Sequence, residues 1–191
     1  GAALYLIQAS PHIDSCTFSD NSSQNGGAVF LYQSAPLITH CVFTNNDADK
    51  GGALFCMNGS SMRFNHNLCH QNTARVGGAI MFEGSSGLLD GNEFYRNGCT
   101  GTNNAGGGII MFRAYDITIS ENIFQTNFAS HGGAIFMDSC ADQSITIRQC
   151  YLIKNQATDF GGAIHIRNSS PNIIDNTIAQ NVFHSDGGGI F

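Results

Sequence analysis

The side chains that come nearest to an acid–base site are Asp138, His165 and Arg167. A polysaccharide lyase needs carboxylates that hold Ca²⁺ against the acidic groups of its substrate, and an arginine or lysine that removes a proton. Glu83 is the next carboxylate of this set, two repeats before Asp138. We interpret Asp138 and Arg167 as an exposed ion pair between neighbouring repeats, and His165 as an ordinary surface residue. We therefore expect no catalytic residues, and polysaccharide cleavage at these positions is the alternative.

The cysteines and acidic residues do not form a metal-binding pattern. The seven cysteines lack CxxC spacing and are not paired with histidines as in zinc sites. The glycine-rich nonapeptide that binds calcium in β-rolls is also missing, because no aspartate follows the glycines at the required offset. We expect no metal and no cofactor, and we interpret most cysteines as small buried hydrophobes with free thiols.

A glycine signature recurs along the whole sequence and would position these side chains. Gly-Gly-Ala followed by an aliphatic residue, or a close variant, recurs at intervals of 25 to 29 residues. It begins at Gly1, Gly26, Gly51, Gly77, Gly106, Gly132, Gly161 and Gly187. A fixed period in this range indicates a solenoid, in which every repeat is one coil.

A second signature lies midway in each interval and ends on asparagine every time. Equivalent residues of stacked coils lie about 4.8 Å apart, so amide side chains can bond along the column and satisfy turn backbone. We predict an asparagine ladder at Asn21, Asn46, Asn72, Asn97, Asn127, Asn155 and Asn181.

Three apolar segments in each repeat predict three short strands per coil. They lie at the glycine signature, around a mid-coil apolar residue and in the asparagine signature, while the 3.6-residue period of helices is absent. We expect an all-β fold, a right-handed single-stranded parallel β-helix of about seven coils with 25–29 residues each. Short insertions are expected at residues 98–104 and 138–144. The chain 1–191 is expected to form one domain.

The pairing of Gly-Gly-Ala-[Ile/Leu/Val] with Phe-x-x-Asn resembles the repeats of the polymorphic outer-membrane-protein family and related bacterial β-helix proteins. The resemblance covers essentially the whole chain. Departures are Cys69, Leu152 and Ile178 at the phenylalanine position, and glycine in place of alanine in two repeats. The resemblance implies a surface adhesin, an autotransporter passenger or a large secreted protein, hence an extracellular or cell-surface location.

Strand alternation in the first segment predicts an apolar stripe on the outside of the rod. If the aliphatic residue of the signature points inward, the next residue points outward. Exposed apolar area on this scale marks an interface. The expected interface residues are Tyr5, Phe30, Phe55, Met81, Ile110, Phe136 and Phe191. Two alternatives are that another segment of the full protein covers the stripe, or that the alternation is reversed and His165 is a core histidine.

The composition excludes two classes of partner. The net charge is −6, with only eight lysines and arginines and no basic cluster, so we expect no nucleic-acid binding. No apolar stretch approaches the roughly 20 residues that span a bilayer. We expect no membrane span in this segment, and any export signal would lie outside it.

These observations favour a non-catalytic structural or adhesive rod that binds protein, either another copy or the remainder of the parent polypeptide, with glycans as further partners. Both ends carry the same motif without a polar cap, so we expect the protein to continue on both sides or to stack into a filament. The alternative is a carbohydrate-binding or carbohydrate-cleaving β-helix that stacks sugars on Tyr5 and Tyr32.

Overall fold

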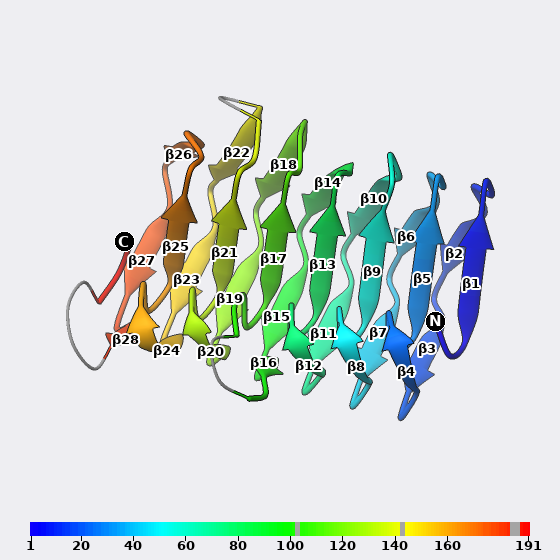
Figure 1. Ribbon diagram of the computed structural model, residues 1–191, viewed down its shortest axis with the longest axis horizontal. Coiled ribbons are helices and arrows are strands. Elements are labelled where there is room, and N and C mark those ends of the chain that lie inside the picture. The colour runs from blue at the N-terminus through cyan, green and yellow to red at the C-terminus, as the bar shows by residue number, and fades with distance from the viewer. Residues whose placement is uncertain (102–103, 142–143, 184–187) are drawn as a thin grey trace.

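The chain forms a rod of stacked coils (Figure 1). The computed structural model describes residues 1–101, 104–141, 144–183 and 188–191. Within these residues all regular secondary structure is β-strand, and the strands form four parallel sheets of seven strands each. Strands that pair come from successive coils, so a parallel β-helix of about seven coils is confirmed.

Each coil contributes one strand to each sheet, and we number the sheets 1 to 4 in the order in which the chain visits them. Sheet 1 contains β1 (Leu4–Ile7), β5 (Val29–Tyr32), β9 (Leu54–Met57), β13 (Ile80–Glu83), β17 (Ile109–Phe112), β21 (Ile135–Asp138) and β25 (Ile164–Arg167). Sheet 2 contains β2 (His12–Asp14), β6 (Leu37–Thr39), β10 (Ser61–Asn65), β14 (Ser86–Asp90), β18 (Ile117–Ser120), β22 (Ile145–Arg148) and β26 (Asn172–Ile174). Sheet 3 contains β3 (Thr17–Ser19), β7 (Val42–Thr44), β11 (Leu68–His70), β15 (Glu93–Tyr95), β19 (Ile123–Gln125), β23 (Tyr151–Ile153) and β27 (Thr177–Ala179). Sheet 4 contains β4 (Ser22–Asn25), β8 (Asp47–Lys50), β12 (Thr73–Val76), β16 (Gly98–Cys99), β20 (Phe128–His131), β24 (Gln156–Phe160) and β28 (Val182–Phe183).

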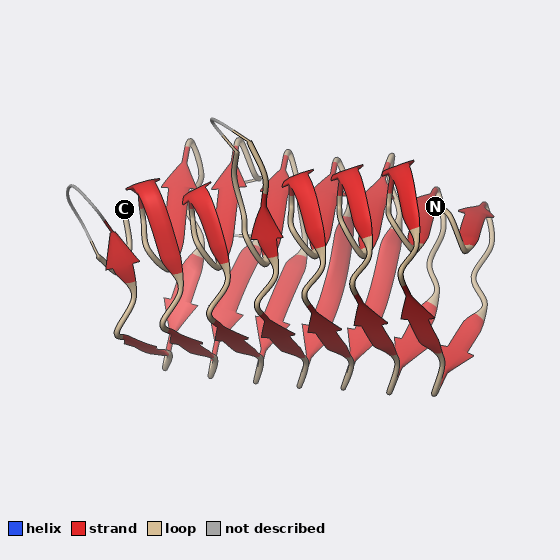
Figure 2. Cartoon of the chain, turned by 90° about the horizontal axis from the view of Figure 1, so that it is seen from below, coloured by secondary structure: helices blue, strands red, loops and turns tan. Residues whose placement is uncertain are grey.

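The prediction of three strands per coil is wrong, because sheet 4 adds a fourth. Figure 2 shows the rows of strands that surround the coil interior. The sheet 4 segments are short and largely polar; β8, for example, reads Asp-Ala-Asp-Lys. Such a strand is stabilised by hydrogen bonds to the coils on either side, and it buries little more than one small side chain such as Ala48 or Ala74.

The interior of the coils is one continuous apolar core. The aliphatic residues of the glycine signature point into it, and Leu54, Ile80 and Ile109 are fully buried. Phenylalanines of sheet 3 stack from coil to coil, with the ring centroids of Phe94 and Phe124 4.7 Å apart. A fully buried side chain of this kind contributes about 1.5–3 kcal/mol.

Asparagines form a ladder at the corner between sheets 3 and 4. The Asn97 Oδ1 accepts hydrogen bonds from the backbone N–H of Asn72 at 3.0 Å and from its Nδ2 at 2.9 Å. Asn97 Nδ2 in turn donates to Asn127 Oδ1 and to the carbonyl of Cys69. The same coil-to-coil bonds join Asn21, Asn46, Asn72, Asn97, Asn127, Asn155 and Asn181.

A second ladder at the corner between sheets 2 and 3 mixes asparagine with cysteine. Asn92 Oδ1 accepts from the N–H and the Nδ2 of Asn67. Cys41 takes the same role with its thiol, which accepts the Cys16 N–H at 3.4 Å and lies 3.1 Å from the Thr39 carbonyl and 3.7 Å from that of Ile13. Cysteine is therefore a structural substitute for asparagine here. All seven cysteines, which lie in the described residues, have free thiols.

Parts of three sequence features lie outside the described residues. These are the insertions expected at residues 98–104 and 138–144, and the last glycine signature at Gly187. The neighbouring described strands keep their register: β16 pairs with β12, and β21 runs through Asp138.

Candidate functional site: a groove beside sheet 1

The outward side chains of sheet 1 form a second apolar cluster, separate from the coil interior. Five residues of the expected stripe belong to it: Phe30, Phe55, Met81, Ile110 and Phe136. They are only 1–7% exposed, so the expectation that the stripe is exposed is wrong for these five. Tyr5 and Phe191, at the two ends, are 60% and 52% exposed.

The residue just before the first glycine of the signature, at or beyond the end of a sheet 4 strand, covers this stripe in five coils. Lys50 Nζ lies 5.3 Å from the ring centroid of Phe55, and the His131 ring lies 6.4 Å from that of Phe136. We call these side chains the cover column: Lys50, Val76, Ala105, His131 and Phe160.

The two glycines of the signature make the turn that brings sheet 4 over sheet 1. Gly77 has a φ of +68°, a conformation that disfavours residues with a Cβ. A Cβ at Gly78 would overlap the carbonyl of Gly107 and the backbone of Gly98. Only glycine therefore allows successive coils to turn at this corner with their backbones so close.

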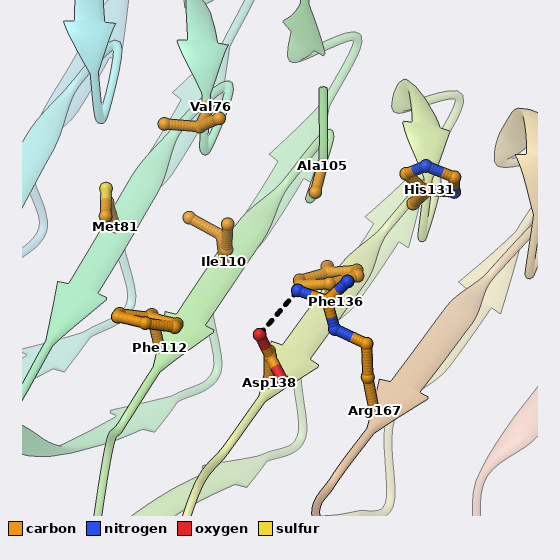
Figure 3. A pocket seen from close by; sticks show the side chains of 9 residues that line it. All are labelled: Val76, Met81, Ala105, Ile110, Phe112, His131, Phe136, Asp138 and Arg167. Atoms are coloured by element: carbon orange, nitrogen blue, oxygen red, sulfur yellow. Dashed lines mark hydrogen bonds and ion pairs between the residues drawn. The ribbon is translucent and has the colours of Figure 1, made fainter. Parts of the chain in front are cut away.

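A groove runs along the rod between the cover column and a second row on sheet 1, the rim, which contains Glu83, Phe112, Asp138 and Arg167. The groove widens into a hollow of about 450 Å³, which is the size of a small ligand site (Figure 3). Its lining residues are Val76, Met81, Ala105, Ile110, Phe112, His131, Phe136, Asp138 and Arg167.

Asp138 and Arg167 form an ion pair at one end of the hollow (Figure 3). Arg167 donates to Asp138 Oδ2 at 2.6 Å, while Ser139 Oγ and Asn168 Nδ2 donate to Oδ1. The hydrogen bond from Arg167 is the main cause that holds the pKa of Asp138 below its ordinary value, and burial opposes it. The Asp138 side chain is only 6% exposed and that of Arg167 is 60% exposed, so the expectation of an exposed pair is wrong for the carboxylate.

His165 lies among aromatic rings and is 8% exposed, so it is not the surface residue that we expected. Its ring contacts those of His131, Phe136 and Phe160 at centroid distances of 5.0–5.8 Å. Burial, and then the nearby His131 and Arg167, lower the pKa of His165 to about 4, so the ring is neutral near pH 7. Its Nδ1 is buried without a hydrogen-bond partner in the described residues, and so is the Nδ1 of His131.

A family model for the right-handed β-helix region matches residues 2–183. The chain belongs to the right-handed β-helix family. Searches of curated proteins and of solved structures gave no match. Membership of this family agrees with the coils described above and indicates that the β-helix is right-handed. The family does not specify a function, so the function of this chain is argued from its groove.

The groove brings together only two of the four side chains that the sequence suggested for a polysaccharide lyase site. Asp138 and Arg167 meet, whereas His165 is packed into the aromatic cluster. Glu83 lies two coils from Asp138 and pairs instead with Lys50, at 3.2 Å across the groove. The Asp138 carboxylate already accepts three hydrogen bonds and carries its charge at neutral pH, so it is poorly suited to exchange a proton with a substrate.

Two further findings concern metals and membranes. Among the described residues, no three or more histidine, cysteine, aspartate or glutamate side chains are placed to hold a metal ion. In the same residues we find no helix with the length and apolar character needed to cross a bilayer.

Sequence reasoning identified the floor of the groove but not its cover column. The cover residues are lysine, valine, alanine, histidine and phenylalanine, a mixture without a recognisable pattern. Their shared position, one residue before the first glycine of each signature, is the only signal that could have revealed them.

Proposed function

We propose that this β-helix is a non-catalytic rod of an extracellular or cell-surface protein and that it associates with protein partners along the groove. The observation that carries the proposal is the apolar floor at Met81, Ile110 and Phe136, which lines an open hollow between the cover column and the rim. Apolar surface in a concave site favours association, because its burial removes water from both partners.

The rod itself is suited to hold such a groove in a fixed shape. Two ladders of hydrogen bonds run along its corners, and a continuous core fills the coils. Each coil is held by its neighbours on both sides, so groove residues from different coils keep their spacing. The partner in this proposal is a second copy of the chain or another segment of its parent polypeptide.

An extracellular or surface location is supported by the resemblance of the repeats to those of the polymorphic outer-membrane-protein family. The resemblance points to one specific group of repeat proteins within the broader range of β-helix proteins. The location that it implies is therefore part of our proposal.

Glycan binding, with or without cleavage of an acidic polysaccharide, is the second candidate. It is favoured by the rings of Phe112 and Phe136, which line the hollow beside the guanidinium of Arg167. Aromatic faces next to a cation are suited to a sugar that carries an acid group.

Sedimentation velocity over a concentration series tests the proposal. We expect reversible association that is weakened at least tenfold by Val76→Glu, which places a charge in the groove. Val42→Glu is the matched control, because Val42 lies on β7 in sheet 3 and does not line the hollow. A chain that stays monomeric at all concentrations would exclude a second copy as the partner, and equal effects of both substitutions would contradict association along the groove. Product release from an acidic polysaccharide in a parallel assay would favour the second candidate.

A further inference from the structure

One end of the hollow carries hydrogen-bond donors that the rod does not use. The guanidinium of Arg167 has five N–H donors, and its side chain is 60% exposed. Among the described residues its one hydrogen-bond acceptor is Oδ2 of Asp138. The remaining donors face a site where a carboxylate could bind them in a charge-assisted pair.

A second arginine lies beside the rim at this end of the hollow. Arg113 directly follows the rim residue Phe112, and its guanidinium lies over the Phe112 ring at 4.9 Å. Its backbone N–H donates to the carbonyl of Asp138 in the next coil. Arg113 and Arg167 come from the coils on either side of Asp138, which pairs with Arg167, while the Asp159 carboxylate lies 3.9 Å from His131 on the cover side. The chain as a whole has a net charge of −6, so the two guanidinium groups are complementary to acidic surfaces such as its own.

The rest of the hollow fits an apolar group. Met81, Ile110 and Phe136 form its floor, and His131 lines its side with Nε2 3.9 Å from the Asp159 carboxylate. A side chain bound to this floor would lie among apolar atoms and one neutral or weakly polar ring.

The spacing of these features matches an extended peptide. The Arg167 guanidinium reaches from β25 to within 5.7 Å of the Phe136 ring of β21, in the coil next to that of Ile110 (Figure 3). Coils stack ~4.8 Å apart, and in an extended chain residues two apart lie about 6.6 Å from each other and point to the same face.

We infer that the groove receives a partner segment in which an apolar side chain on the floor precedes or follows, by two residues, a carboxylate bound by Arg167. The inference rests on the proposed function, and it specifies the chemistry of the partner: an acidic and apolar protein segment in an extended conformation.

Fluorine NMR can test the inference with short capped peptides as probes. The first probe is acetyl-(4-fluoro-Phe)-Gly-Glu-amide, and the second has Gln in place of Glu. Because a hydrogen bond to a charged group contributes about 1.5–3 kcal/mol, we expect the Glu peptide to bind the native chain about tenfold more tightly or better. Arg167→Gln should reduce that ratio to about one. Arg148→Gln, on the outer face of sheet 2, is the matched control and should leave the ratio unchanged.

Arg167→Gln also leaves the buried Asp138 carboxylate without its cation, so a second variant keeps the test independent of folding. Arg113→Gln leaves that pair intact and should reduce the preference for Glu several-fold. Equal binding of the two peptides by the native chain would overturn the inference, and so would a preference that survives both substitutions. Preference for an oligosaccharide of uronic acids over the Glu peptide would overturn it as well. If the peptides fail while Val76→Glu still weakens association in sedimentation, the inference is wrong and the proposed function stands.

Discussion

The substitution Asn97→Ala tests whether the asparagine ladder holds the coils together. Asn97 is fully buried and makes four side-chain hydrogen bonds: two that it accepts from Asn72, and one donated to each of Asn127 and Cys69. Alanine leaves the Asn72 N–H buried without its side-chain acceptor, which costs about 1–3 kcal/mol. The three other lost bonds cost about 0.5–1.5 kcal/mol each. We expect a total loss of about 2.5–7.5 kcal/mol in the free energy of unfolding.

Asn21→Ala is the matched control, since Asn21 occupies the same column. Its side chain makes one ladder bond, from Nδ2 to Asn46 Oδ1, and that oxygen keeps the bond from the Asn21 N–H. We expect a loss of about 0.5–1.5 kcal/mol. Urea unfolding followed by circular dichroism and by tyrosine fluorescence measures both variants, and agreement between the two probes checks that unfolding is cooperative. If Asn97→Ala costs no more than Asn21→Ala, the ladder does not stabilise the rod in the way that we describe.

Three more predictions concern individual side chains. Because burial lowers the pKa of His165 to about 4, below its ordinary value of 6.5, the neutral ring favours the folded state above pH 6.5. Part of that stability, on the order of 2 kcal/mol, should be lost as the pH falls toward 4, and His165→Phe should flatten this dependence in urea unfolding; an unchanged slope would contradict the buried neutral ring. Gly98→Ala should destabilise the chain by about 1–3 kcal/mol, because the new methyl group would overlap the Phe128 ring. Phe128→Ala in the same chain should recover much of that loss, and an additive double variant would show that the ring is not the cause. Ellman's reagent should modify Cys16 alone in the folded chain and all seven cysteines after denaturation, because the other six are buried and burial raises the pKa of Cys56 and Cys99 to about 12. Rapid reaction of a second thiol would contradict the packing at that cysteine.

The repeat made most of the fold predictable from the sequence. Equivalent residues such as Leu54 and Ile80 are paired in register in neighbouring strands, so the columns of the sequence are columns of the structure. The apolar segments of sheets 1, 2 and 3 carry the alternation that marks a strand with one buried face.

Sheet 4 could not be predicted in the same way. Segments such as Asp47–Lys50 have the composition of a turn, and their strand conformation depends on hydrogen bonds to neighbouring coils. In the second ladder Cys41 and Asn67, although chemically unlike, both accept a backbone N–H, as the sequence column that mixes cysteine with asparagine indicates.

The groove depends on how sheets 1 and 4 meet, which no single segment specifies. Alternation separated Phe55 and Phe136 from the coil interior, but their burial by Lys50 and His131 follows from the turn at the two glycines. The ion pair of Asp138 and Arg167 was expected from their equivalent positions. The burial of Asp138 was not, because it results from the side chains packed around the end of β21.

Hydroxyl-radical footprinting of the free and associated chain tests the role of the groove most directly. We predict that association protects Phe112 and His131, which line the hollow, and leaves Tyr151 as reactive as before, since Tyr151 is 51% exposed on sheet 3. Protection of Tyr151 with unchanged reactivity of Phe112 and His131 would show that the partner binds sheet 3, and would contradict the groove as the docking surface.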